Sequence, residues 1–313
     1  MASNTKFDLV NPLVRSKQRE ATADPEGFWA RAAEELPWFR RWDAVFDWQP
    51  PTFRWFIGGE TNLAYNAIDH QVTEGRGDHA ALISLDERGG RNVYTYLHLQ
   101  TEVKRTAAGL RGLGIGTGDR VAIYMPTCPE AIVLMLACMR IGAIHMVVFA
   151  GFGANALAER MKLAGAKALF ATDITYRRGQ DVSLLPVAGD AAEIARSEGV
   201  LEHLVVLKRS AASTLPDGAL TWDAFLAAGN GHDDTHVVLE SDSPAYILAT
   251  SGTTATPKLA VHTHGAYQVY IHAMARWMFD LKPSDVWWAS SDIGWVVGHS
   301  YICLLYTSPS PRD

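Results

Sequence analysis

The part of the chain best suited to chemistry is a short segment in which hydroxyl groups, a glycine and a lysine follow an apolar run. Residues 246–249 read Tyr-Ile-Leu-Ala, which favours a buried strand. The residues after it that could contact an anion are Thr250, Ser251, Gly252, Thr253, Thr254 and Lys258. Small residues let backbone N–H groups approach an anion, hydroxyls add donors, and a lysine supplies a point charge. The segment is therefore predicted to hold phosphate groups. The alternative interpretation is a Ser/Thr-rich hairpin turn, and the spacing is not that of a Walker A loop.

Alternating strands and helices are predicted on the N-terminal side of this segment. Strands are expected at residues 80–85, 94–96, 120–125, 145–149, 168–172 and 204–207, and helices at residues 97–113, 128–141, 154–163, 188–196 and 222–228. This alternation predicts an α/β fold with a parallel sheet covered on both faces. Thr127 is predicted to cap a helix, with Glu130 completing a capping box. Gly142 and Gly165 are predicted to end helices.

Residues 1–78 are predicted to form a tryptophan-rich arm. Its aromatic residues include Phe28, Trp29, Trp38, Trp42, Trp48 and Trp55. Each such side chain has about 150–250 Å² of surface to bury, so we expect the arm to anchor on a neighbouring domain. Beyond the arm, a first α/β subdomain is predicted over residues 79–236 and the start of a second over residues 237–302.

The composition excludes several classes of protein. The 313 residues are 48% hydrophobic and 20% charged, which is too apolar for a disordered chain. A net charge of −6 argues against a nucleic-acid binder that relies on phosphate contacts. Three cysteines without C-x-x-C spacing disfavour a disulfide framework and a structural zinc site.

Neither a membrane span nor a secretory signal is expected. The longest apolar run, residues 131–139, is about half of the ~20 residues that a span needs. Residues 1–20 lack the apolar stretch of a signal peptide. A cytoplasmic protein is expected, with the mitochondrial matrix as the alternative.

The hydroxyl-rich segment resembles the phosphate loop of the AMP-forming acyl-CoA synthetases of the adenylate-forming superfamily, whose usual form is [ST]-S-G-[ST]-T-G-x-P-K-G. Ala255 and Leu259 stand here where glycines are usual. Other segments resemble motifs of the short-chain branch, the acetyl- and propionyl-CoA synthetases: residues 54–56, 61–63, 66–69, 140–145, 149–152 and 291–301. The resemblance covers about residues 25–302. It implies a partial large N-terminal domain, with a mostly parallel sheet flanked by helices, from a C-terminally truncated member.

The resemblance implies two half-reactions. A short-chain carboxylate, propionate or acetate, attacks the α-phosphorus of ATP and gives acyl-AMP and pyrophosphate. The thiol of coenzyme A then displaces AMP. Mg²⁺ would bridge the phosphates, and the family's metal ligands are expected beyond residue 313, with none in this chain. The alternatives are a ligase for another small acid and a non-catalytic module that binds a nucleotide or coenzyme A.

The resemblance also implies roles for individual residues. Thr250 and Lys258 are the implied catalytic residues of the phosphate loop. The residues implied to contact coenzyme A are Arg177, Arg178, Gly179, Gln180 and Val297. Those implied to line the acyl pocket are Trp295, Val296 and Val297. A solvated basic turn and a buried Trp-Val-Val strand are the alternative interpretations of these two segments. Valine at position 297, where acetyl-type enzymes often have threonine, favours propionate with residual use of acetate.

Residues near the predicted acyl pocket are expected to be structural. Asp292 is predicted to orient the loop of Trp295. His299 is predicted to be structural or substrate-orienting, because a carboxylate with a pKa near ~4 needs no base. Trp287 and Trp288 are predicted to lie in the core.

Residues 303–313 are predicted to be a non-native tail. Serine and proline residues that follow a buried motif directly fit neither a strand nor a helix. The chain alone is therefore expected to be inactive, with no release of pyrophosphate.

Overall fold

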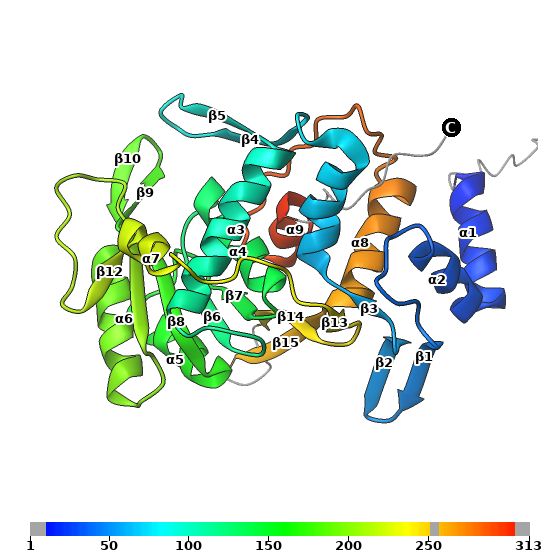
Figure 1. The fold of residues 1–313 in the computed structure, drawn as a ribbon, viewed down its shortest axis with the longest axis horizontal. Helices are drawn as coiled ribbons and strands as arrows, with labels where there is room; N and C mark the ends of the chain where they lie inside the picture. Colours follow the sequence, from blue (N-terminus) through cyan, green and yellow to red (C-terminus); the bar gives the residue numbers. More distant parts are fainter. Residues whose placement is uncertain (1–10, 251–256, 304–313) are drawn as a thin grey trace, which may run out of the picture.

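The fold is organised around a seven-stranded sheet (Figure 1). The computed structural model describes residues 11–250 and 257–303. The strand order is β12-β11-β8-β6-β7-β14-β15, and every neighbouring pair is parallel except β14 and β15. The strands are β6 (Arg120–Tyr124), β7 (Ile144–Val147), β8 (Ala166–Thr172), β11 (His203–Leu207), β12 (Ala219–Thr221), β14 (Pro244–Thr250) and β15 (Lys258–Thr263). The predicted α/β fold with a mostly parallel sheet is confirmed.

Helices cover both faces of the sheet, because successive residues of a strand point to opposite sides. In β6, Val121 and Ile123 join the core formed with α3 and α4, whereas Ala122 and Tyr124 join the core formed with α5 and α6. The helices are α3 (Tyr96–Gly112), α4 (Pro129–Arg140), α5 (Ala154–Ala164), α6 (Leu185–Ser197), α7 (Trp222–Ala228) and α8 (His264–Trp277). None of the described helices is both long and apolar enough to cross a membrane.

Small two-stranded ribbons and short helices surround this framework. The ribbons are β1 (Ala44–Gln49) with β2 (Thr52–Ile57), β3 (Glu60–Thr61) with β13 (Leu239–Glu240), β4 (Ala80–Leu85) with β5 (Arg91–Thr95), and β9 (Ile174–Arg177) with β10 (Gln180–Ser183). The remaining elements are α1 (Pro12–Ala23), α2 (Pro25–Ala33), α9 (Val296–Gly298), η1 (Tyr65–Asp69), η2 (Val72–Arg76) and η3 (His299–Cys303).

Two predicted helix ends, at Gly142 and Gly165, are confirmed, and one predicted helix start, at Thr127, is wrong. Gly165 ends α5 at φ 63°, and Gly142 follows α4 at φ 73°, both in the left-handed region that favours glycine. The predicted capping role of Thr127 is wrong, because α4 begins at Pro129 with Cys128 as its N-cap and no side-chain cap bond. Proline lacks an N–H and its fixed φ suits the first helical position, so the helix starts there and Thr127 lies too far upstream.

The tryptophan-rich arm packs on α8, as predicted. Trp42 and Phe56 share one buried cluster with Val269 and Ala273 of that helix. Trp48 differs from the other arm tryptophans of this set, because it is exposed on the β1–β2 ribbon.

The prediction that Trp287 and Trp288 lie in the core is wrong. Trp288 is 83% exposed, and Trp287 is also exposed. Both belong to residues 279–291, which form neither a helix nor a strand. A segment without regular structure has no periodic apolar face, so its hydrophobic residues are not all buried.

The main sheet continues across the predicted subdomain limit. β14 pairs in parallel with β7, so residues 237–302 extend the sheet formed within residues 79–236. The limits of the subdomains stay a prediction. Most of the predicted tail, residues 304–313, lies outside the described residues.

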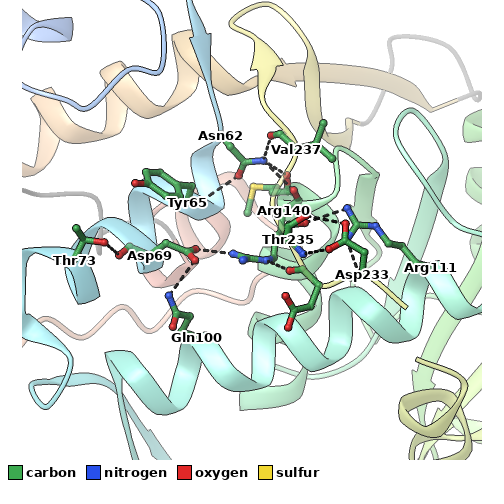
Figure 2. A network of polar contacts seen from close by, with 12 residues as sticks. Asn62, Tyr65, Asp69, Thr73, Gln100, Arg111, Arg140, Asp233, Thr235 and Val237 are labelled. Carbon is green, nitrogen blue, oxygen red and sulfur yellow. Dashed lines mark hydrogen bonds and ion pairs between the residues drawn. The ribbon is translucent and has the colours of Figure 1, made fainter. Parts of the chain in front are cut away.

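A buried polar network fastens the arm to α4 (Figure 2). Arg140 is 2% exposed, and its Nη1 donates to Asp69 Oδ2 at 2.6 Å while its Nε donates to the Asp234 carbonyl at 2.7 Å. Asn62 Nδ2 donates to the Arg140 carbonyl at 3.0 Å and to the Val237 carbonyl at 2.9 Å. The network therefore joins three parts of the chain: the arm, the end of α4 and residues 234–237.

We expect Asp69→Asn to lower the free energy of unfolding by about 3–5 kcal/mol, because it leaves the buried guanidinium of Arg140 without its counter-charge. The matched control is Lys162→Met, which breaks an ion pair with Glu198 whose side chains are 42% and 40% exposed. Exposed pairs contribute about 0–1 kcal/mol. Urea unfolding of both variants measures the difference, and equal losses of stability would contradict the structural role of the buried pair.

Candidate functional site

Two predicted site segments, and one of the motifs that resemble the family, follow the carboxyl ends of strands in the main sheet. Thr250 ends β14, Phe149 follows β7, and the β9–β10 ribbon follows β8. Because β8, β6, β7 and β14 are parallel neighbours, these strand ends lie on the same side of the sheet, here called the carboxyl edge. Ligands of α/β proteins bind outside the carboxyl ends of such strands. The fold therefore brings these segments to one region.

The structure brings the two ends of the predicted phosphate loop together. Thr250 is the register partner of Lys258 on the antiparallel strand β15, and Thr250 Oγ1 donates to the Lys258 carbonyl at 3.3 Å. Both side chains are exposed at the carboxyl edge. The predicted loop residues between them, Ser251, Gly252, Thr253 and Thr254, lie outside the described residues. The ammonium of Lys258 is thus available to a ligand, whereas the Thr250 hydroxyl already donates to the Lys258 carbonyl.

Leucine is compatible with the backbone at position 259, where the resembled motif has a glycine. Leu259 lies within β15 and pairs with Ala249 of β14. Its φ is not in the left-handed region, which among the described non-glycine residues holds Phe56, Arg178 and Asp280. The departure from the motif at Leu259 therefore imposes no backbone strain.

Trp295, Val296 and Val297 are exposed at the start of the short helix α9. Trp295 is 55% exposed, and its ring centroid lies 6.1 Å from that of Phe149 at the carboxyl edge. The alternative interpretation of a buried Trp-Val-Val strand is wrong, because the segment is helical and faces outward. Its role as an acyl pocket stays a prediction.

Asp292 holds the loop that leads into α9, as predicted. Its Oδ1 accepts a hydrogen bond from the Gly294 amide at 2.7 Å, and its carbonyl accepts one from the Trp295 amide at 3.0 Å. Gly298 closes the loop, because a Cβ atom there would lie 2.0 Å from the Asp292 carbonyl oxygen. Burial raises the pKa of Asp292, while the Gly294 amide and the charge of Arg177 act against that shift.

The predicted coenzyme A segment forms the turn of the β9–β10 ribbon. Arg178 at φ 54° and Gly179 at φ 75° are its central residues, and both are left-handed. A non-glycine residue in this region costs roughly 1 kcal/mol or more. An open surface hollow is lined by Arg177, Arg178, Gln180 and Val182, all of them exposed. The turn therefore presents two guanidinium groups at the surface beside this hollow.

Two further arginines lie beside this turn, and no local pattern indicated them. The guanidinium carbons of Arg88 and Arg209 lie 3.9 Å and 4.1 Å from the ring centroid of Tyr176 on β9. Both residues come from segments distant in sequence from the ribbon. Their proximity is a product of the tertiary structure and adds to the positive charge around the turn.

A buried cluster of histidine and tyrosine side chains joins strands β7 and β14 to α8 and η3. His299 Nε2 and His145 Nε2 are 2.7 Å apart, and His299 Nδ1 lies 3.0 Å from the Tyr267 hydroxyl. The rings of His299 and Tyr246 stack with centroids 3.8 Å apart. Both ring nitrogens of His299 are thus occupied within the protein, which agrees with the predicted structural role.

The comparisons with known proteins agree with this geometry. A family model described as "AMP-binding enzyme" matches residues 68–308, and one described as "Acetyl-coenzyme A synthetase N-terminus" matches residues 15–67. The chain belongs to the AMP-binding enzyme family. The sequence motifs indicated a resemblance over about residues 25–302, and the two matches extend it to residues 15–308.

The relatives of this AMP-binding chain are acyl-CoA synthetases by name. An acetyl-coenzyme A synthetase from Deinococcus radiodurans is 43% identical over 289 residues, which cover 91% of this chain and 44% of that protein. One from Rhodopirellula baltica is 41% identical over 305 residues, with coverage of 91% and 45%. The structure of acetoacetyl-CoA synthetase from Streptomyces lividans superposes with a TM-score of 0.82 at 26% identity, covering 92% of this chain and 44% of that one. The chain thus spans less than half the length of these relatives.

Three buried histidines of this AMP-binding chain, His145, His264 and His299, lie where burial disfavours the charged ring. Burial lowers the pKa of His145 and of His264 to about 3, and lowers the pKa of His299 well below its ordinary value. His145 was missed as a site-supporting residue, although a histidine within an apolar strand indicates a buried polar group that needs a partner. That partner, His299, is 154 residues away in sequence, so the pair could not be inferred from the sequence.

We expect the stability of the chain to fall as the pH drops from 7.5 to 5.0. A histidine whose folded pKa is lowered contributes stability that is fully present above its unfolded pKa of ~6.5 and is lost below it. Each of these three histidines should therefore remove about 2 kcal/mol over this range. His264→Asn removes one such group and keeps an acceptor for the Leu63 amide, which donates to His264 Nδ1 at 3.2 Å. Urea titrations at several pH values should show a shallower pH dependence for this variant, and an identical slope would contradict the assignment.

Proposed function

We propose that this chain provides the ATP- and coenzyme A-binding part of an enzyme that converts a short-chain carboxylate to its acyl-CoA. The observation that carries the proposal is the convergence at the carboxyl edge. There Thr250 ends β14 and the arginine turn follows β8, two parallel strands of the main sheet, while Trp295 contacts Phe149, which follows β7, in a chain of the AMP-binding family. The names of its acetyl-coenzyme A synthetase relatives support the class of reaction.

In the first proposed step, a carboxylate oxygen attacks the α-phosphorus of ATP. An acyl–phosphate bond forms, the bond between the α-phosphorus and the bridging oxygen breaks, and pyrophosphate leaves with the electron pair. We assign Lys258, together with Thr250, its register partner at the other end of the loop, to the charge that would develop on the β- and γ-phosphates. Donors fixed before the reaction stabilise such charge without reorganisation.

In the second proposed step, the coenzyme A thiol attacks the acyl carbonyl carbon. A thioester bond forms, the bond to AMP breaks, and the thiol proton passes to solvent. Arg177 and Arg178 would contact the phosphates of coenzyme A from the β9–β10 turn, with Gly179 and Gln180 completing that turn. Guanidinium groups match phosphate geometry and remain charged at all physiological pH values.

Mg²⁺ would enter this site together with ATP and neutralise charge on its phosphates. Within residues 11–250 and 257–303, no group of three or more His, Cys, Asp or Glu side chains could hold a metal ion. We therefore assign it no protein ligand in this part of the chain.

We expect Lys258→Met to weaken ATP binding by about tenfold or more, because it removes a charge-assisted contact to the phosphates. Thr250→Val should weaken ATP binding less, because it removes a neutral donor. Isothermal titration of the chain with ATP and with adenosine measures the effect, and adenosine binding should not change. Lys162→Met is the control for loss of a lysine elsewhere. Unchanged ATP affinity in the Lys258 variant would refute the phosphate-loop assignment.

The proposed acid has two or three carbons, with propionate preferred because Val297 removes a hydroxyl from the expected pocket. We expect Val297→Thr, in a protein of the relatives' full length, to shift kcat/KM toward acetate by up to about 10-fold. The measurement is kcat/KM for both acids in the parent and the variant. A parent enzyme that prefers acetate would contradict the assignment of Val297. Activity with a larger acid alone would favour the alternative ligase.

A further inference from the structure

The position of the arginine turn depends on contacts outside the main sheet. The β9–β10 ribbon forms a separate two-stranded sheet. Its base is fixed by Asp173, whose carboxylate accepts hydrogen bonds from the Arg209 amide at 2.7 Å and the Ser210 amide at 3.0 Å. No ladder of the main sheet reaches the turn at Arg178 and Gly179, where the backbone is left-handed.

The loop between β4 and β5 contacts the β9–β10 ribbon and its turn. Glu87 Oε2 accepts a hydrogen bond from the Gly179 amide at 3.1 Å. Arg88 forms an ion pair with Asp181 of β10, and its guanidinium stacks on Tyr176 of β9. These contacts hold both strands of the ribbon and the turn itself. They join residues separated by about ninety positions in the sequence.

The β4–β5 loop is itself ordered enough to act as a support. Asp86 Oδ1 accepts hydrogen bonds from the Arg88 amide at 2.8 Å and the Gly90 amide at 2.9 Å. The Asp86 amide donates to the Gly90 carbonyl at 3.0 Å, which closes the loop. The side chains of Glu87 and Arg88 therefore start from a fixed backbone.

We propose that Glu87 and Arg88 are positioning residues for coenzyme A. They hold the β9–β10 turn in its left-handed conformation, so that Arg177 and Arg178 face the nucleotide phosphates, although neither Glu87 nor Arg88 lines the hollow beside the turn. This inference rests on the proposed function, which places coenzyme A at that turn.

The charge of Glu87 gives the proposal a test in which positioning and simple electrostatics predict opposite results. Removing an anion near a phosphate site should tighten binding if only charge matters. If Glu87 positions the turn, Glu87→Ala should instead weaken binding of coenzyme A by about fivefold, the loss of one hydrogen bond that orders the site. Glu87→Gln keeps an oxygen that can accept from the Gly179 amide, and should restore most of the affinity.

The experiment is isothermal titration of the chain with coenzyme A and, separately, with ATP. We expect Glu87→Ala and Arg88→Met to weaken coenzyme A binding and to leave ATP binding unchanged. Arg91→Met is the matched control, because Arg91 lies on the same ribbon without a described contact to β9 or β10. Amide hydrogen exchange at Gly179 without ligand should be faster in Glu87→Ala than in Arg91→Met.

Each outcome bears on one of the two proposals. Coenzyme A affinity that is equal or higher in Glu87→Ala overturns the positioning role and leaves the proposed function standing. An equal loss in Arg91→Met would show a general charge effect and overturns the role of Arg88. A parent chain that does not bind coenzyme A overturns the proposed function, and the positioning role with it.

Discussion

The parallel pairing of β8, β6, β7 and β14 is the constraint on which the rest of the molecule depends. Parallel strands must return through crossover connections, so their carboxyl ends all lie on one side of the sheet. In this chain those ends carry the arginine turn, Phe149 and Thr250. An antiparallel arrangement of the same strands would divide these residues between two edges. The candidate site is therefore a consequence of strand direction before any side chain is considered.

The buried parts of the structure keep that edge in place by two different means. Apolar residues on both faces of each strand fix the helices against the sheet, with Val121 and Ala122 on opposite sides. The Arg140–Asp69 pair fixes the orientation of the arm relative to α4, because a buried guanidinium is favourable only where its acceptors surround it. It ties the arm to the end of α4, the helix that leads into β7 and hence to Phe149 (Figures 1 and 2).

Charge is distributed unevenly between the edge and the interior. The described cations suited to phosphate, such as Lys258 and Arg178, are exposed at the carboxyl edge. Behind them, burial lowers the pKa of His145 and of His299, and their Nε2 atoms share a hydrogen bond, while the buried Nδ1 of His145 has no partner among the described residues. His145 and His299 therefore add no positive charge of their own behind these exposed cations.

Local pattern was sufficient for the fold class, most elements and the family. Apolar strands, helical periodicity and left-handed glycines such as Gly165 are encoded within a few residues, so they can be inferred from neighbours in the chain. The helix at Trp222–Ala228 has the predicted limits. The prediction that Thr127 caps α4 was wrong, because the helix starts at Pro129 and a proline favours the first helical position. The prediction that Trp288 is buried was wrong, because hydrophobic composition alone does not define a buried face.

Contacts between distant segments were decided by tertiary structure alone. The amino-acid sequence by itself predicted a phosphate-binding segment at residues 250–258, because side-chain type and local spacing indicate one, and the family resemblance implied a second at residues 177–180. It could not determine that Glu87 would meet Gly179, or His145 meet His299, because such pairs form only when the chain folds back over long separations. The physical reason is that local chemistry is fixed by covalent neighbours, whereas the geometry of a site is fixed by packing.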